Sequence, residues 1–199
     1  MYDSPQYMDS VTLGIGLREW WRHYRRRRAS ETVRMEAVEI SWLGITGKWV
    51  ADRDQQRAAW EMYVELITRI SIQPLARDEG LLREALASLY SLFGETRRIL
   101  KSYGPGVAQP LPGSDVSFGQ LAVEVLNRLL RPLLARWHPL LLEHEQQRAQ
   151  GVGAREHERR WAHHGELRRE LERIRGEMSS YATLLAKASG ISGLHGSRP

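Results

Sequence analysis

The stretch from residue 117 to residue 147, SFGQLAVEVLNRLLRPLLARWHPLLLEHEQQ, places the strongest constraint on what this chain can fold into. Its apolar residues lie nearly all round a helix, which is typical of a helix buried on most of its surface. Ser117 and Gln120 form the capping-box pattern that begins a helix. A helix of this kind is stable only where other helices cover it, so the sequence predicts an all-α protein.

Two prolines interrupt this stretch. Pro132 has no backbone N–H to donate, and we expect it to bend the helix. Pro139 is expected to begin a new turn, with His138 in an extended conformation, because a proline disfavours the helical conformation in the residue before it.

The same stretch does not read as a membrane span. A lipid-facing helix would not tolerate its polar residues Glu124, Asn127, Arg128, Arg131, Arg136 and His138. At the start of the chain, the short apolar run VTLGIGL precedes the basic cluster, the reverse of a secretory signal. We therefore expect a cytoplasmic protein without a transmembrane segment.

Apolar residues spaced three and four apart predict the helices that cover this stretch. The expected fold is an elongated up-and-down bundle of four main helices, at about 48–71, 78–103, 117–147 and 155–189. One or two shorter helices are expected before them, at about 16–28 and 30–43, with glycines at 44 and 47 interrupting the second. The predicted organisation is a basic, aromatic N-terminal arm or helix (1–29), the helical bundle (30–189) and a flexible tail (190–199).

Composition limits the chemistry. With 199 residues and 42% hydrophobic residues, the chain is long and apolar enough to bury one substantial core. It has no cysteine, which excludes disulfides, thiolate metal sites and cysteine nucleophiles. We find no phosphate-binding loop, nucleophile elbow or dinucleotide fingerprint, and no cofactor is predicted.

The last predicted helix carries a heptad seam of apolar residues. The members of this association seam are Leu167, Leu171, Ile174, Met178, Tyr181 and Leu185. A seam of this kind can pair with a second copy of the chain or with another protein. It can equally be covered within the monomer.

The N-terminal segment WWRHYRRRR combines arginines with aromatic rings. Its candidate binding residues are Arg18, Trp20, Trp21, Arg22, Tyr24, Arg25, Arg26, Arg27 and Arg28. Between residues 16 and 28 such side chains can grip phosphates and stack on bases, or hold an anionic membrane surface. The third alternative is an ordinary first helix whose arginines are solvated or paired.

Histidines in the last predicted helix invite a metal interpretation, which their spacing does not favour. His157 and His164 are seven residues apart, whereas a helix that binds a metal normally uses residues three or four apart. No metal site is predicted.

An arginine followed a few residues later by a histidine resembles the motif of helical ribonucleases of the HEPN type. Arg159 and His164 have this spacing, as do Arg131 with His138 and Arg18 with His23. An arginine-rich sequence produces such pairs by chance, and the resemblance covers no other part of the chain. It implies a metal-independent ribonuclease with Arg159 and His164 as its catalytic candidates.

Because none of these patterns forms a full catalytic constellation, the leading hypothesis is a non-enzymatic helical scaffold or adaptor of the bacterial cytoplasm. It would act by binding another protein or a second copy of itself. The alternatives are a nucleic-acid-binding regulatory protein and the ribonuclease.

Overall fold

The computed structural model describes residues 37–69 and 79–191. The chain divides into two compact units, Met1–Met35 and Glu36–Pro199, and every described residue belongs to the second. The predicted N-terminal arm, the helix expected at 16–28 and most of the predicted tail lie outside the described residues.

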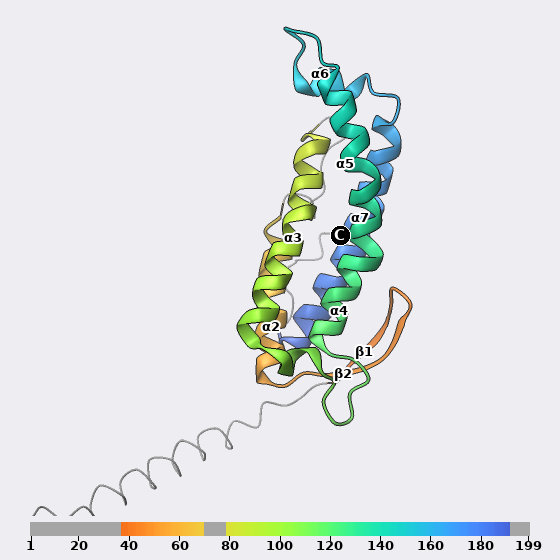
Figure 1. Cartoon of the computed structure of the whole chain (residues 1–199). Helices are drawn as coiled ribbons and strands as arrows, with labels where there is room; N and C mark the ends of the chain where they lie inside the picture. Colours follow the sequence, from red (N-terminus) through yellow and green to blue (C-terminus); the bar gives the residue numbers. More distant parts are fainter. Residues whose placement is uncertain (1–36, 70–78, 192–199) are drawn as a thin grey trace, which may run out of the picture. The chain divides into compact units, whose positions relative to one another are not determined.

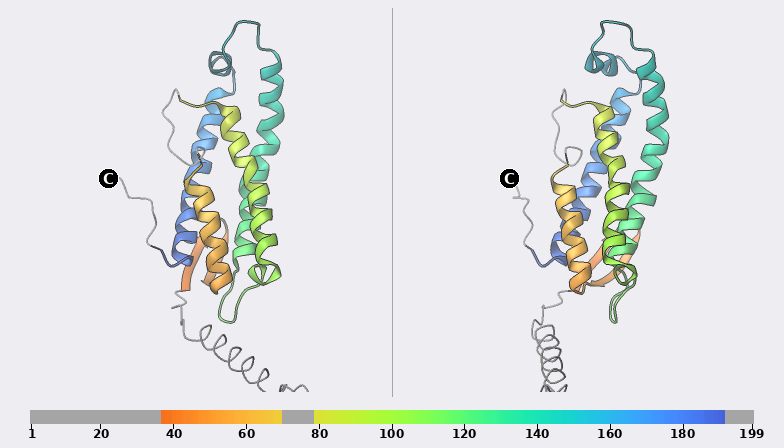
Figure 2. Two further views of the ribbon diagram at one scale, coloured as in Figure 1. Left: turned by 90° about the vertical axis from the view of Figure 1, so that its left-hand side faces the viewer. Right: turned by 60° about the vertical axis from the view of Figure 1, so that its left-hand side comes forward.

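The described part of the chain is mostly helical, as the sequence predicts (Figure 1). Its long helical segments lie side by side, and successive segments run in opposite directions (Figure 2). The α-helices are α2 (Arg53–Ile67), α3 (Leu82–Tyr103), α4 (Phe118–Glu124), α5 (Arg131–Gln146), α6 (Ala154–Arg159) and α7 (His164–Ala188). A short 3-10 helix, Pro105–Ala108, follows α3.

A two-stranded antiparallel sheet replaces the C-terminal part of the helix predicted at 30–43. Its strands are β1 (Ala37–Trp42) and β2 (Ile45–Val50). Leu43 and Gly44 form the turn between them with φ of 53° and 74°, the left-handed values that a two-residue hairpin turn requires. Val38 and Ile40 face the core while Glu39 is exposed, which is the alternation of a strand and not the helical face that the prediction requires.

The helix predicted at 48–71 was therefore placed too early. Residues 48–50 belong to β2, and α2 begins at Arg53. The Asp52 side chain caps α2 by accepting a hydrogen bond of 2.9 Å from the Gln55 N–H. The helix predicted from residue 78 begins at Leu82 instead.

The stretch 117–147 is helical over nearly the whole predicted range, and the capping box of Ser117 and Gln120 is present. The prediction for Pro139 was wrong, because α5 continues through this residue and His138 is helical. Before Pro132 the chain forms a π-helical turn, Val125–Leu130, in which the Arg131 N–H donates to the Leu126 carbonyl. This wider turn accommodates a proline that has no N–H for the regular ladder.

The helix predicted at 155–189 is divided in two. The short α6 ends at Arg159, a turn follows, and α7 begins at His164. The break lets α6 leave the line of α7 and contact α5. The break lies before Leu167, the first residue of the predicted association seam.

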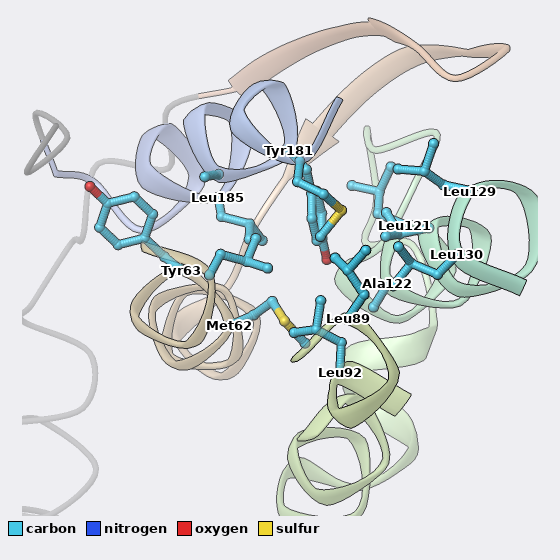
Figure 3. Close-up of a cluster of buried hydrophobic side chains, with 14 of the residues drawn as sticks. Met62, Tyr63, Leu89, Leu92, Leu121, Ala122, Leu129, Leu130, Tyr181 and Leu185 are labelled. Atoms are coloured by element: carbon cyan, nitrogen blue, oxygen red, sulfur yellow. The ribbon is translucent and has the colours of Figure 1, made fainter. Parts of the chain in front are cut away.

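One hydrophobic core joins the helices and the hairpin. Figure 3 shows its central side chains, which come from α2, α3, α4, the π-helical turn and α7. The residues labelled there are Met62, Tyr63, Leu89, Leu92, Leu121, Ala122, Leu129, Leu130, Tyr181 and Leu185. Burying a side chain of this size contributes about 1.5–3 kcal/mol, so the core is the main source of stability.

A fully buried glutamine, Gln55, connects the hairpin with α2 and α4 through hydrogen bonds. Its Oε1 accepts from the indole N–H of Trp49 at 2.8 Å and from the Phe118 backbone N–H at 3.0 Å. Its Nε2 donates to the Gln109 carbonyl at 3.3 Å. One amide thus links β2, α2, the first residue of α4 and the segment that precedes α4.

Gln55→Leu leaves two donors and one carbonyl without their partner inside the protein. We expect a loss of about 3 kcal/mol or more in the free energy of unfolding, because each orphaned buried group costs roughly 1–3 kcal/mol. Urea denaturation measures this loss in the free energy of unfolding. Gln56→Leu is the matched control, because Gln56 is half-buried and its amide reaches only the neighbouring Ala51 carbonyl. Equal losses in the two variants would contradict the role of Gln55.

The Tyr181 ring stacks on Trp42 with ring centroids 5.5 Å apart, while its buried hydroxyl has no hydrogen-bond partner among the described residues. Burial raises the pKa of this phenol. Tyr181→Phe keeps the ring and removes the buried hydroxyl that lacks a partner. We therefore expect the free energy of unfolding, measured by thermal or urea denaturation, to rise by about 1 kcal/mol. Tyr181→Ala is expected to lose about 3–5 kcal/mol. A clear loss in the phenylalanine variant would refute this account of the hydroxyl.

Candidate functional site

The predicted association seam of α7 lies in the core of the chain itself. Leu167, Ile174, Met178, Tyr181 and Leu185 are buried, and Leu171 is half-buried. The helix α7 packs against α2 and against β1. Of the two alternatives that the sequence left open, the structure shows coverage within the monomer.

The other candidate residues lie outside the described part of the chain or are separated from one another. The binding residues between Arg18 and Arg28 lie outside the described residues. Arg159 is the last residue of α6 and His164 the first of α7, so a turn separates the two catalytic candidates. In the described ranges, no group of three or more histidine, aspartate or glutamate side chains is placed to hold a metal ion.

His157 pairs with a histidine that the sequence did not single out. Its ring lies 3.9 Å from that of His144, with an angle of 4° between the planes. Nε2 of His144 lies 2.9 Å from the His157 carbonyl, and Nε2 of His157 lies 2.7 Å from the His144 carbonyl. Each Nε2 therefore carries a proton and donates it to a backbone oxygen. Stacked rings that use Nε2 in this way hold α6 on α5 and cannot direct these atoms at a shared metal ion.

A buried carboxylate completes the attachment of α6. Glu158 is 5% exposed, and its Oε2 accepts from the Leu82 backbone N–H at 3.0 Å. Residue 81, which precedes α3, is a leucine and provides no side-chain cap. The Glu158 carboxylate thus caps α3 from a distant part of the chain, where the helix dipole favours a negative charge.

An exposed aromatic strip crosses from α3 to α5 on the outside of the protein. We call it the α3–α5 surface and define it as Tyr90, Phe93, Arg131, His138 and Leu142. Tyr90 is 62% exposed and Leu142 49% exposed, while Phe93 and His138 are half-buried. The Tyr90 ring connects the two helices, since its centroid lies 5.8 Å from that of His138 on α5. On α3 itself, the Tyr90 centroid lies 6.0 Å from that of Phe93.

The helical repeat explains why these residues share a surface. Tyr90 and Phe93 are three apart on α3, and His138 and Leu142 are four apart on α5, spacings that put neighbours on one helix face. The α3 and α5 helices contact each other, and the Tyr90 and His138 rings meet between them. The Arg131 guanidinium lies over the Phe93 ring at 5.8 Å and bounds one end of the strip.

An ion pair fixes the other end. The Arg83 guanidinium holds the Glu145 carboxylate with distances of 2.9 Å from Nε to Oε1 and 2.6 Å from Nη2 to Oε2. Its remaining nitrogen, Nη1, donates to Nδ1 of His138 at 3.0 Å. This assigns the His138 proton to Nε2, an atom that has no hydrogen-bond partner in the described part of the chain. Burial, followed by the nearby Arg83 charge, lowers the pKa of His138.

The α3–α5 surface is suited to binding rather than to reaction. It combines aromatic and aliphatic area with a fixed arginine–glutamate pair, and it contains no nucleophile beside a base. Neither Tyr90 nor Leu142 is among the site residues that the sequence predicts. The apolar periodicity of 117–147 indicates a helix that is buried on most sides. It does not identify which of its apolar residues the neighbouring helices leave exposed.

Comparisons of the chain with protein-family models, with curated proteins and with solved structures find no match. No helix in the described residues has the length and apolar character needed to cross a membrane.

The lowered pKa of His138 makes stability depend on pH. Below about pH 6.5, the ordinary pKa of histidine, the unfolded chain takes up a proton that the folded His138 resists, so this residue makes stability fall as the pH falls. We expect an NMR titration to give His138 a pKa below 6.5, and Arg83→Met to raise it. Arg97→Met, an exposed change on the same helix, is the control. A His138 pKa at or above 6.5 would contradict the arrangement.

Proposed function

We propose that this chain is a non-enzymatic helical scaffold or adaptor that binds another protein through the α3–α5 surface. One observation carries the proposal: two large apolar side chains are exposed on neighbouring helices, Tyr90 on α3 and Leu142 on α5, and the Tyr90 ring contacts the half-buried His138, which lies one helical turn before Leu142. Protein interfaces combine such an apolar, aromatic centre with a polar rim. Tyrosine and arginine are among the residues that contribute most to binding energy.

The arrangement of the strip supports binding at low entropic cost. Its side chains lie on two packed helices rather than on loops, and ring contacts hold Phe93, Tyr90 and His138 against one another. The Arg83–Glu145 pair and Arg131 keep charged groups at its two ends. A surface ordered before binding loses less conformational entropy when the partner arrives.

In this proposal the helices form a rigid support. The helices α2, α3 and α7, together with the segment from α4 to α5, act as an elongated up-and-down bundle in the cytoplasm. Contacts of α3 with α2, α5 and α7 support this role. So does the attachment of α6 through Glu158, which holds the N-terminus of α3 beside the Arg83–Glu145 pair.

The test compares two double variants of exposed residues. Tyr90→Ser/Leu142→Ser removes the apolar centre of the α3–α5 surface. Trp60→Ser/Val123→Ser is the matched control, because Trp60 is 40% and Val123 41% exposed and neither belongs to that surface. Both should remain folded by circular dichroism, since exposed side chains contribute little to stability.

Each protein is used to recover partners from its native lysate, with quantitative mass spectrometry as the readout. We expect at least one partner to be lost, by tenfold or more, with the α3–α5 variant and retained with the control. A photo-cross-linking residue at position 90 should capture the same partner, and one at position 60 should not. Equal recovery of every protein by the two variants would overturn the proposal.

A further inference from the structure

Two arginines at one end of the α3–α5 surface have no carboxylate among the described residues to balance their charge. Arg131 is exposed, and its Nε donates to the neutral amide oxygen of Asn127 at 3.2 Å. The two Nη atoms of Arg131 form no hydrogen bond with a described residue. Arg97 is also exposed, and it lies on the same face of α3 as Phe93 because it follows that residue by four positions. Arg97 likewise forms no ion pair with a described residue.

Carboxylates on the neighbouring turns of both helices are already engaged. Glu124 forms an ion pair with Arg128, which lies four residues further along the chain. Glu95 pairs with Arg98 at 2.8 Å, and Arg98 also reaches Glu61 of α2 at 3.1 Å. None of these acidic groups is left to neutralise the two arginines.

The charge of the α3–α5 surface is therefore distributed unequally. At one end the Arg83–Glu145 pair is neutral. At the other end Arg97 and Arg131 leave a net positive charge, with the exposed Tyr90 between the two ends of the strip on α3. Basic side chains of a partner would be repelled there, whereas carboxylates would gain charge-assisted hydrogen bonds.

We infer that the partner of the α3–α5 surface is a protein segment in which apolar side chains cover Tyr90 and Leu142 and carboxylates bind Arg97 and Arg131. This inference rests on the proposed function, since it names the chemistry of the partner. The Arg131 guanidinium is held over the Phe93 ring at 5.8 Å, so it loses little freedom when it binds a carboxylate. Its two Nη atoms allow the paired hydrogen bonds that arginine forms with carboxylates.

The spacing along α3 sets the distance between the apolar and the acidic parts of the partner. Arg97 follows Tyr90 by seven residues, which is about 10 Å along a helix axis. A carboxylate that binds Arg97 therefore lies about two helical turns, or about three residues of an extended chain, from the side chain that covers Tyr90. A nucleic acid would satisfy the arginines through its phosphates, but it offers no aliphatic side chain to Leu142, which is 49% exposed.

The test uses the full chain and a library of random-sequence peptides displayed on phage. Peptides selected on the native chain are measured by fluorescence polarisation, both in their own sequence and with each acidic residue changed to its amide. We expect the selected peptides to be enriched in acidic and apolar residues. The amide versions should bind about three- to tenfold more weakly, because exposed ion pairs contribute modestly. High salt should reduce this difference.

Matched pairs of substitutions locate the effect. Arg97→Gln/Arg131→Gln should bind the acidic peptides and their amide versions with equal affinity. Arg169→Gln/Arg173→Gln is the control, because both arginines are exposed on α7 and neither forms an ion pair with a described residue. This control should keep the preference of the native chain for acidic peptides. Both variants should remain folded by circular dichroism, since all four positions are exposed.

The outcomes separate this inference from the proposed function. Peptides that are lost with Tyr90→Ser/Leu142→Ser but show no acidic preference overturn the inference and leave the binding surface in place. A library that yields no binder also overturns the inference, while recovery from the lysate still tests the proposed function. Peptides that bind the serine variant as well as the native chain count against both. A single-stranded RNA that displaces the peptides and depends on Arg97 and Arg131 would replace the acidic segment with a nucleic acid.

Discussion

The buried amide of Gln55 is the interaction on which the rest of the described structure depends. It satisfies the Trp49 indole of the hairpin and the first N–H of α4, and its own N–H bonds the Gln109 carbonyl. Polar groups taken out of water without a partner cost more than a hydrogen bond returns, so this amide selects one arrangement of the elements around it. The hairpin is thereby fixed against α2 and α4.

A second set of polar contacts organises the opposite end of the helices. Glu158 caps α3, the stacked pair of His144 and His157 holds α6 on α5, and Arg83 links Glu145 to His138. These contacts are partly or wholly shielded from water, where charge-assisted hydrogen bonds are strongest. They hold α3 and α5 in the relative position that exposes the α3–α5 surface.

The α3–α5 surface follows from how these contacts distribute the apolar and polar groups. The seam of α7 is covered inside the chain, whereas the α3–α5 surface leaves Tyr90 and Leu142 exposed among the described residues. Exposed aromatic and aliphatic groups of this kind are suited to a partner with apolar side chains.

The sequence by itself determined the mostly helical character, the helical stretch 117–147 and its capping box, because these depend on local periodicity and on side chains that bond their own backbone. Only the tertiary structure decided the hairpin at 37–50, the continuity of α5 through Pro139 and the break between α6 and α7. Contacts between residues far apart in the sequence outweigh local preference at these places: Trp42 stacks on Tyr181, and Glu158 caps α3. The same long-range packing buried the predicted seam and left Tyr90 and Leu142 exposed, since periodicity identifies an apolar face without identifying the helix that covers it.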